Sequence, residues 1–228
     1  MREQHVYNRK IIVNPGYLSN NTLIFVIGKE DRMTELIAQT VYFARPGPGN
    51  TERTLVVAHE RAAALGLDTV LVATTSGATA VRAAEVFAGF MVVAVTHSTG
   101  FNAPFTQELT PENAEALARA GARILTTTHA FGGIGRAVRK KLGTYEIDEI
   151  IAFTLRTFGQ GMKVTAEIAL MAADAGLVPA GKPVLAMAGS GRGADTAVVL
   201  YPTHAQTFFD LAFAEIVCMP SPRHPALG

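Results

Sequence analysis

The sequence of 228 residues contains a single cysteine, Cys218, and no tryptophan. One cysteine excludes an internal disulfide framework, and a lone thiol near the end of a chain is more typical of a core than of a nucleophile. Aromatic residues make up only 7% of the chain, so no stacking platform for single-stranded nucleic acid is visible. The net charge of +1 argues against nucleic acid and against a polybasic membrane surface as partners.

The sequence also lacks any apolar run near the ~20 residues that a membrane span requires, and the polar, mixed segment Met1–Lys10 does not resemble a signal peptide. The cytoplasm is therefore the expected location. The histidines and the single cysteine show no metal-ligand spacing, so we predict no metal site. What the chain does have is 49% hydrophobic and 17% charged residues, the composition of a globular protein rather than a disordered one.

A linker divides the chain. Arg45-Pro46-Gly47-Pro48-Gly49-Asn50 combines proline and glycine, which both resist regular structure. We therefore expect an N-terminal arm at residues 1–44 and one α/β domain at residues 45–228. Within the arm, the pattern indicates a strand at 23–27 and a helix at 31–43.

After the linker, short apolar β-branched segments alternate with amphipathic ones. The pattern predicts strands at 69–73, 91–96, 123–127, 183–188, 196–201 and 215–219. It predicts helices at 51–65, 78–88, 111–121, 134–142, 146–158 and 164–175. Such alternation is typical of a mainly parallel sheet covered on both faces, and the short loops between the last strands predict an antiparallel edge.

One loop carries a specific chemical signal. Thr74-Thr75-Ser76-Gly77-Ala78-Thr79 joins a strand to a helix at the carboxyl edge of the sheet, where α/β proteins bind ligands. Free backbone N–H groups and the helix dipole favour an anion there, and the hydroxyls of Thr75, Ser76 and Thr79 add donors. Gly77 permits a close approach of the backbone. The loop is thus a candidate phosphate site without lysine; the alternative is that Ser76 only caps the helix.

A glycine-rich loop, Gly189-Ser190-Gly191-Arg192-Gly193-Ala194-Asp195, precedes another strand. A dinucleotide fingerprint would open a helix instead, so this motif is not one. One hypothesis is a ligand wall, in which Arg192 contacts a phosphate or Asp195 a hydroxyl. The alternative is a wide hairpin with no ligand.

Two histidines follow other predicted strands. His97 lies in Thr96-His97-Ser98-Thr99-Gly100-Phe101 and His129 in a loop after the third strand of the domain. Each is a candidate proton donor, although a lone histidine is more often structural. Because the carboxyl ends of parallel strands share one edge, these loops are expected to meet. The basic run from Arg136 to Lys141 is interpreted as a solvated helix face, and Lys163, near a helix start, as a more distant candidate for an anion.

At this point the sequence resembles a known family, the free-standing archaeal and bacterial relatives of the pyruvate kinase C-terminal α/β domain. The resemblance covers about residues 45–220. The matching words are Pro46-Gly47 with Asn50-Thr51, Ser76-Gly77-Ala78-Thr79-Ala80, Val95-Thr96-His97 with Thr99-Gly100-Phe101, Phe158-Gly159 with Gly161 and Lys163, Met171-Ala172-Ala173-Asp174, Arg192-Gly193-Ala194-Asp195-Thr196-Ala197, and Ile216-Val217-Cys218-Met219-Pro220.

The resemblance implies a three-layer α/β/α sandwich that binds a phosphorylated small molecule at the Thr75–Ala80 turn. In free-standing relatives that ligand is understood to be FMN, with the Thr96–Phe101 and Ser190–Asp195 loops beside its ring and ribityl chain. We expect no pyruvate kinase activity, because the catalytic barrel needs ~200 or more residues. A ligand-binding module, a flavin-dependent oxidoreductase using His97 or His129, and a phosphosugar sensor remain open, as does homo-oligomerisation.

Overall fold

The computed structural model describes residues 23–26 and 34–227 of the chain. The chain divides into two compact units, residues 1–39 and 40–228. In the first unit, β1 (Leu23–Val26) and β2 (Thr34–Ile37) form a two-stranded antiparallel sheet. The strand expected at 23–27 is thereby confirmed, except that Ile27 and the arm's first 22 residues lie outside the described residues.

The prediction of a helix at 31–43 is wrong. The segment instead contains β2 and, in the second unit, β3 (Val41–Phe43). β3 pairs in parallel with a strand at the other end of the chain, so that Val41 lies opposite Cys218. A long-range partner supplies these backbone hydrogen bonds, and local periodicity carries no information about it.

The second unit alternates strands and helices, as expected. Its strands are β4 (Thr69–Ala73), β5 (Met91–Thr96), β6 (Arg123–Thr126), β7 (Val184–Ala188), β8 (Thr196–Tyr201) and β9 (Ala212–Pro220). Its α-helices are α1 (Thr51–Ala64), α2 (Ala78–Val86), α3 (Pro111–Arg119), α4 (Ile134–Leu142), α5 (Ile147–Arg156) and α6 (Gln160–Asp174), with short 3₁₀ helices η2 (Pro48–Asn50) and η3 (Ala205–Asp210). Helix α6 begins four residues before the predicted start, and this brings Lys163 into its first turn.

The second unit is built on a seven-stranded sheet in the order β3-β9-β8-β7-β4-β5-β6. β8 pairs antiparallel with β7 and β9, and the other four neighbouring pairs are parallel. The sheet is therefore mainly parallel with an antiparallel part, as predicted. The outermost strand next to that part is β3, which pairs with β9 in parallel. The carboxyl ends of β4 to β7 and the start of β8 consequently share one edge.

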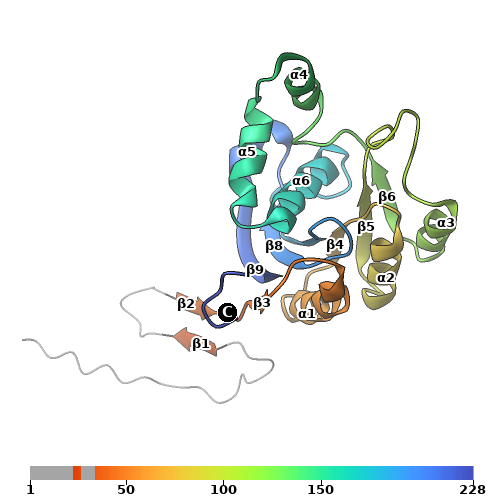
Figure 1. The fold of residues 1–228 in the computed structure, drawn as a ribbon. Helices are drawn as coiled ribbons and strands as arrows, with labels where there is room; N and C mark the ends of the chain where they lie inside the picture. The colour runs from red at the N-terminus through yellow and green to blue at the C-terminus, as the bar shows by residue number, and fades with distance from the viewer. Residues whose placement is uncertain (1–22, 27–33, 228) are drawn as a thin grey trace, which may run out of the picture. The chain divides into compact units, whose positions relative to one another are not determined.

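Helices cover both faces of this sheet (Figure 1). On β4, Val70 and Val72 pack in the cluster that includes residues of α1, α2 and α3, whereas Leu71 points into the cluster that includes α6. Such alternation is the two-residue period of a strand buried on both sides. The α/β/α sandwich is thus confirmed. Cys218 on β9 is fully buried, and burial raises the pKa of its thiol to about 11, which agrees with a core residue.

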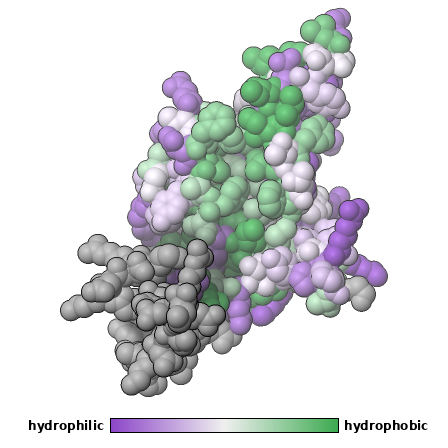
Figure 2. Space-filling model, turned by 90° about the vertical axis from the view of Figure 1, so that its left-hand side faces the viewer, coloured by the Kyte–Doolittle hydropathy of each residue, from purple (hydrophilic) through white to green (hydrophobic). Residues whose placement is uncertain are grey.

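Figure 2 shows apolar side chains gathered on the surface over α4 and α5. The exposed large apolar residues of these two helices and the residues next to them are Ile134, Leu142, Tyr145, Ile147, Ile150, Phe153 and Phe158. They lie outside the two main core clusters. Within residues 23–26 and 34–227, no helix is both long and apolar enough to span a bilayer.

Candidate functional site

A cavity of about 840 Å³ opens at the carboxyl edge of the sheet. It brings together eleven of the candidate residues, which come from four separate loops. These are Thr75, Ser76, Ala78, Thr79, Thr96, His97, Phe101, His129, Gly191, Arg192 and Gly193. The convergence expected from the shared strand edge is therefore present, while contact of these residues with a ligand stays a prediction. The candidates that do not line the cavity are Gly77, Thr99, Gly100, Ser190 and Asp195.

The turn after β4 has hydrogen-bond donors that are not used within the described part of the protein. Among the described residues, none accepts a hydrogen bond from the backbone N–H of Thr75, Ser76, Ala78 or Thr79, and none pairs with the hydroxyls of Thr75, Ser76 or Thr79. The N-cap position of α2 is Gly77, which makes no side-chain cap, and its own N–H donates to Thr74 Oγ1 over 3.1 Å. Ser76 is therefore not a helix cap, and the turn's free donors sit at the positive end of the helix dipole.

Gly77 has a packing role that the sequence did not predict. Its φ is +99°, and a Cβ there would lie 2.5 Å from Asn113 Cβ and 2.6 Å from Leu109 Cδ1. The glycine thus makes room for the start of α3, and Gly77 itself faces away from the cavity. Asn113 Nδ2 and the Thr110 backbone N–H both donate to Ser76 O, so α3 fixes the shape of the turn.

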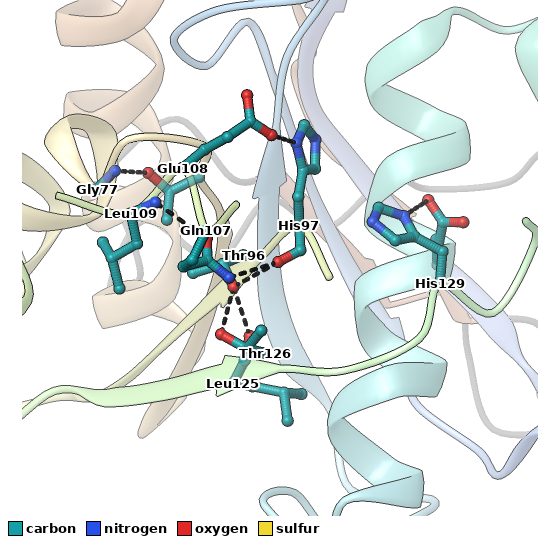
Figure 3. Close-up of polar contacts among 11 residues, drawn as sticks. Gly77, Thr96, His97, Gln107, Glu108, Leu109, Leu125, Thr126 and His129 are labelled. Atoms are coloured by element: carbon teal, nitrogen blue, oxygen red, sulfur yellow. Dashed lines mark hydrogen bonds and ion pairs between the residues drawn. The ribbon is translucent and has the colours of Figure 1, made fainter. Parts of the chain in front are cut away.

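His97 is held in place at the end of β5. Its Nδ1 lies 2.8 Å from Glu108 Oε2, and its backbone carbonyl accepts a hydrogen bond from Gln107 Nε2 (Figure 3). The neighbouring Thr96 hydroxyl is only 2.6 Å from the hydroxyl of Thr126 on β6. Thr96 therefore ties two strands together beneath the cavity, and Glu108 is a lining residue that the sequence did not reveal.

Aromatic rings form one wall of the cavity. The ring of Phe101 lies 4.1 Å from that of His97 and 4.8 Å from that of His129, measured between centroids. The Arg136 guanidinium lies 4.7 Å from the Phe101 ring, within cation–π range. This wall joins the loops after β5 and β6 to the start of α4.

A buried charged group lies on α6. The Lys163 ammonium donates to Glu167 Oε2, the backbone N–H of Phe131 donates to Glu167 Oε1, and His129 Nδ1 lies 3.7 Å from Glu167 Oε2. Burial raises the pKa of Glu167, but His129 and Lys163 outweigh that effect and hold the pKa at about 2. Burial lowers the pKa of Lys163. The Nε2 atom of His129 is buried and has no hydrogen-bond partner among the described residues.

Two of the lining cations were missed or misjudged from the sequence. Arg136 was assigned to a solvated helix face, but it lines the cavity, as does Arg156. Lys163, which the sequence offered as a more distant candidate for an anion, also lines the cavity. The rest of that basic run does not: Arg139 pairs with Glu149, and the other members are exposed. Glu167 was also missed, although a signal existed: Lys163 and Glu167 are opposite charges four residues apart in an apolar helix, which indicates a buried pair. For Arg156 there was none.

The glycine-rich loop packs closely on itself and on the start of α1. A Cβ on Gly189 would lie 2.4 Å from Gly193 O, and a Cβ on Gly193 would lie 2.3 Å from Thr51 Oγ1. Asp195 is fully buried, and its carboxylate accepts hydrogen bonds from Gly47 N, Ser190 N and Thr196 Oγ1. Gly191, Arg192 and Gly193 of this loop line the cavity. Asp195 does not line it and instead holds the loop through these buried hydrogen bonds.

Within the described ranges, no three His, Cys, Asp or Glu side chains are grouped so that they could hold a metal ion. The donors of the cavity are hydroxyls, backbone N–H groups and cationic side chains, which suit an anion rather than a cation.

Comparison with known proteins gives the family of this chain. The family model for the pyruvate kinase α/β domain matches residues 52–200, more than half of the chain. Three pyruvate kinase structures from Cryptosporidium parvum, one in complex with ADP, are similar at 15% identity, with TM-scores of 0.37, 0.35 and 0.35. They cover 67%, 70% and 72% of this chain, which in turn covers 23%, 23% and 24% of theirs. The chain thus spans about a quarter of the length of these proteins. On the family match, the chain belongs to the pyruvate kinase α/β domain family.

Proposed function

We propose that this protein binds a phosphorylated small molecule, with its phosphate on the turn Thr75–Thr79. The supporting observation is the set of free donors at this turn: backbone N–H groups and three hydroxyls face a cavity of about 840 Å³ at the start of α2. A helix start with free N–H groups favours an anion by geometry and by its dipole. The volume is that of a typical small-molecule site.

FMN is the ligand we propose first. It carries one phosphate, a polyol chain and a flat ring, and the residues fit these parts: the turn offers phosphate donors, and Phe101 with His97 offers an aromatic wall. When bound, FMN would supply redox chemistry that no side chain of this cavity has. The remaining support comes from the resemblance of the sequence to flavin-binding relatives.

The phosphate assignment is tested at Ser76. A charge-assisted hydrogen bond contributes roughly 1.5–3 kcal/mol, so Ser76→Ala should weaken FMN binding about tenfold to a hundredfold. The matched control is Ser98→Ala, because Ser98 follows β5 at the same edge without lining the cavity. Quenching of FMN fluorescence measures both affinities. Equal affinities of parent and Ser76→Ala would place the phosphate elsewhere.

A second candidate, a phosphosugar sensor without flavin, is favoured by the arginines. The sequence offered only Arg192 near the predicted loops, which spoke against a multiply charged ligand, but Arg136 and Arg156 also line the cavity. Denaturing protein that was purified without added flavin, and identifying the released compound by mass, separates the two candidates. A colourless protein that takes up no FMN at micromolar concentration would exclude FMN in favour of the phosphosugar.

A further inference from the structure

Helix α5 is apolar on two opposite sides. Its inner side packs in the core cluster that it shares with α6, through Ile151 and Leu155. Its outer side faces solvent and carries Ile147, Ile150 and Phe153, each about half exposed or more. A helix that is apolar all round is typical of a buried position. The outer side of α5 therefore has the composition of an interface, although the described part of the chain leaves it exposed.

The outer residues of α5 have the spacing of a helix–helix seam. Along the sequence, the intervals are three, four and three residues between Ile147, Ile150, Thr154 and Thr157, and all four are exposed. Such spacing forms a stripe along one side of a helix, as in paired helices. The two threonines bring no unpaired hydroxyl to this stripe, because Thr154 Oγ1 donates to Ile150 O over 3.0 Å and Thr157 Oγ1 donates to Thr154 O over 2.7 Å. A partner can therefore cover the stripe without leaving a buried donor unsatisfied.

Helix α4 and the residues that flank the two helices extend this surface, which we call the α4–α5 face (Figure 2). Its large apolar side chains, each 49–84% exposed, are Ile134, Leu142, Tyr145, Ile147, Ile150, Phe153 and Phe158. At roughly 150–250 Å² for a whole large side chain, their exposed parts present an apolar area on the order of 700 Å². The largest apolar patch of a typical monomer is about 300–600 Å², whereas one side of a specific protein interface is about 800 Å². The α4–α5 face thus has the size of an interface.

The charges of the α4–α5 face are of both signs and lie at opposite ends of α5. Glu146 and Asp148 are at its start, and Arg156 is in its last turn, with the guanidinium 5.1 Å from the Phe153 ring. A second α5 in antiparallel orientation would bring Arg156 of each copy to the two carboxylates of the other, and would also oppose the two helix dipoles. An anionic membrane would instead repel these carboxylates. The charges therefore favour a second copy of this chain over a membrane surface.

From these observations we infer that the α4–α5 face is a homodimer interface, in which two copies pack α5 against α5 about a two-fold axis. With the axis at the middle of the helix, Ile147 lies opposite Thr157 of the other copy, and Ile150 lies opposite Thr154. A large side chain then meets a small one at each level, as close packing requires. Both isoleucines contribute twice, because a two-fold interface uses the same surface of both chains. The inference is independent of the proposed ligand, since neither isoleucine lines the cavity.

The first experiment measures the mass of the full chain by sedimentation velocity over a range of concentrations. One chain has a mass of 24.2 kDa, and the parent should sediment with twice that mass at micromolar concentration. Ile147→Glu/Ile150→Glu should raise the dissociation constant of the dimer about a hundredfold or more, because each buried apolar side chain is lost twice. Each single variant should raise it by a smaller factor, which keeps the test valid if the double variant fails to fold.

The second experiment reverses the charges at the ends of α5. Glu146→Lys and Arg156→Glu should each raise the dissociation constant about tenfold, because each places like charges together across the two-fold axis. The variant that combines both changes restores opposite charges and should dimerise as tightly as the parent. Such recovery requires the start of one α5 to lie near the end of the other. A combined variant that dimerises more weakly than either single variant would refute the antiparallel arrangement.

The matched control is Val56→Glu, since Val56 is an exposed apolar residue of α1, in the other helix layer. This variant should keep the mass of the parent. A dimer that Val56→Glu dissociates and the isoleucine variants do not would overturn the inference, as would a parent that sediments at 24.2 kDa throughout the micromolar range. Binding of a monomeric parent to phosphatidylserine vesicles, lost in Ile147→Glu/Ile150→Glu, would also overturn it, by identifying the α4–α5 face as a membrane-binding surface.

Discussion

At the scale of single residues, Glu167 is a carboxylate whose pKa is strongly lowered in the folded protein. Its carboxylate is buried and faces Lys163, His129 and the backbone N–H of Phe131. A buried charge is tolerated only with such partners, and removal of one partner leaves the others uncompensated. The group therefore contributes to stability only while the carboxylate is ionised.

We expect the folded protein to lose stability in acid through Glu167. Its pKa in the folded state is about 2, against 4.5 for an unperturbed glutamate. The stabilisation is complete above pH 4.5 and is lost as the pH falls towards 2, because the unfolded chain takes up the proton first. The difference corresponds to roughly 3 kcal/mol. Urea unfolding at several values between pH 3 and pH 6 measures this loss.

The matched control for this residue is Glu108, a carboxylate that also lines the cavity but is more exposed. Glu167→Gln should be destabilised at neutral pH, since Lys163 then lacks its buried partner, and should show a flatter dependence between pH 3 and pH 5. Glu108→Gln should keep the steep dependence of the parent. An equally steep slope in Glu167→Gln would assign the acid sensitivity to other carboxylates.

Among the elements, the Gly189–Asp195 loop lines the cavity with some residues and supports the fold with others. The sequence hypothesis made Asp195 part of a ligand wall, for which its substitution would lower affinity and leave the melting temperature nearly unchanged. Because Asp195 is fully buried and accepts three hydrogen bonds, the structure supports the opposite outcome. The hydrogen bond to Gly47 also ties this loop to the linker before α1.

Asp195→Ala should therefore destabilise the protein. It leaves the N–H groups of Gly47 and Ser190 without their acceptor, and each buried unpaired group costs about 1–3 kcal/mol. Arg192→Gln is the comparison, because Arg192 is exposed and reaches the cavity from the same loop. We expect a lower melting temperature for Asp195→Ala only, and a lower ligand affinity for Arg192→Gln. An unchanged melting temperature of Asp195→Ala would contradict the structural role and favour the hypothesis that Asp195 contacts the ligand.

How far the elements could be predicted depends on where their determinants lie. Thr110 and Pro111 specify the start of α3 locally, and the structure shows the Thr110 hydroxyl accepting the Asn113 N–H. The strands of the sheet's centre follow from short, mostly apolar runs, such as Val-Leu-Ala-Met-Ala in β7. The strand β3 could not be predicted, because its partner is far along the chain. Arg156 could not be predicted as a site residue, because it reaches the cavity only when α5 and α6 pack together.

At the scale of the whole molecule, the division of the chain differs from the one that the linker suggested. The sequence placed the boundary after residue 44, whereas the compact unit of the sheet begins at Thr40. β3 belongs to this sheet: Thr40 Oγ1 donates to Ile216 O, and Ser221 N donates to Phe43 O. All residues that line the cavity lie within residues 40–228. The absence of pyruvate kinase activity stays a prediction for this chain.

Two shortened chains test this boundary. A chain of residues 40–228 should match the full chain in urea midpoint and in affinity for FMN, because it keeps β3 and the whole cavity. A chain of residues 45–228 loses the pairing of β3 with β9, in which Val41 lies opposite Cys218, and exposes the edge of β9. At about 1 kcal/mol for each lost hydrogen bond, plus the apolar contact of Phe43 with the core, it should be less stable by roughly 3 kcal/mol. Equal midpoints for the two shortened chains would mean that β3 adds nothing to the sheet and that the linker is the true boundary.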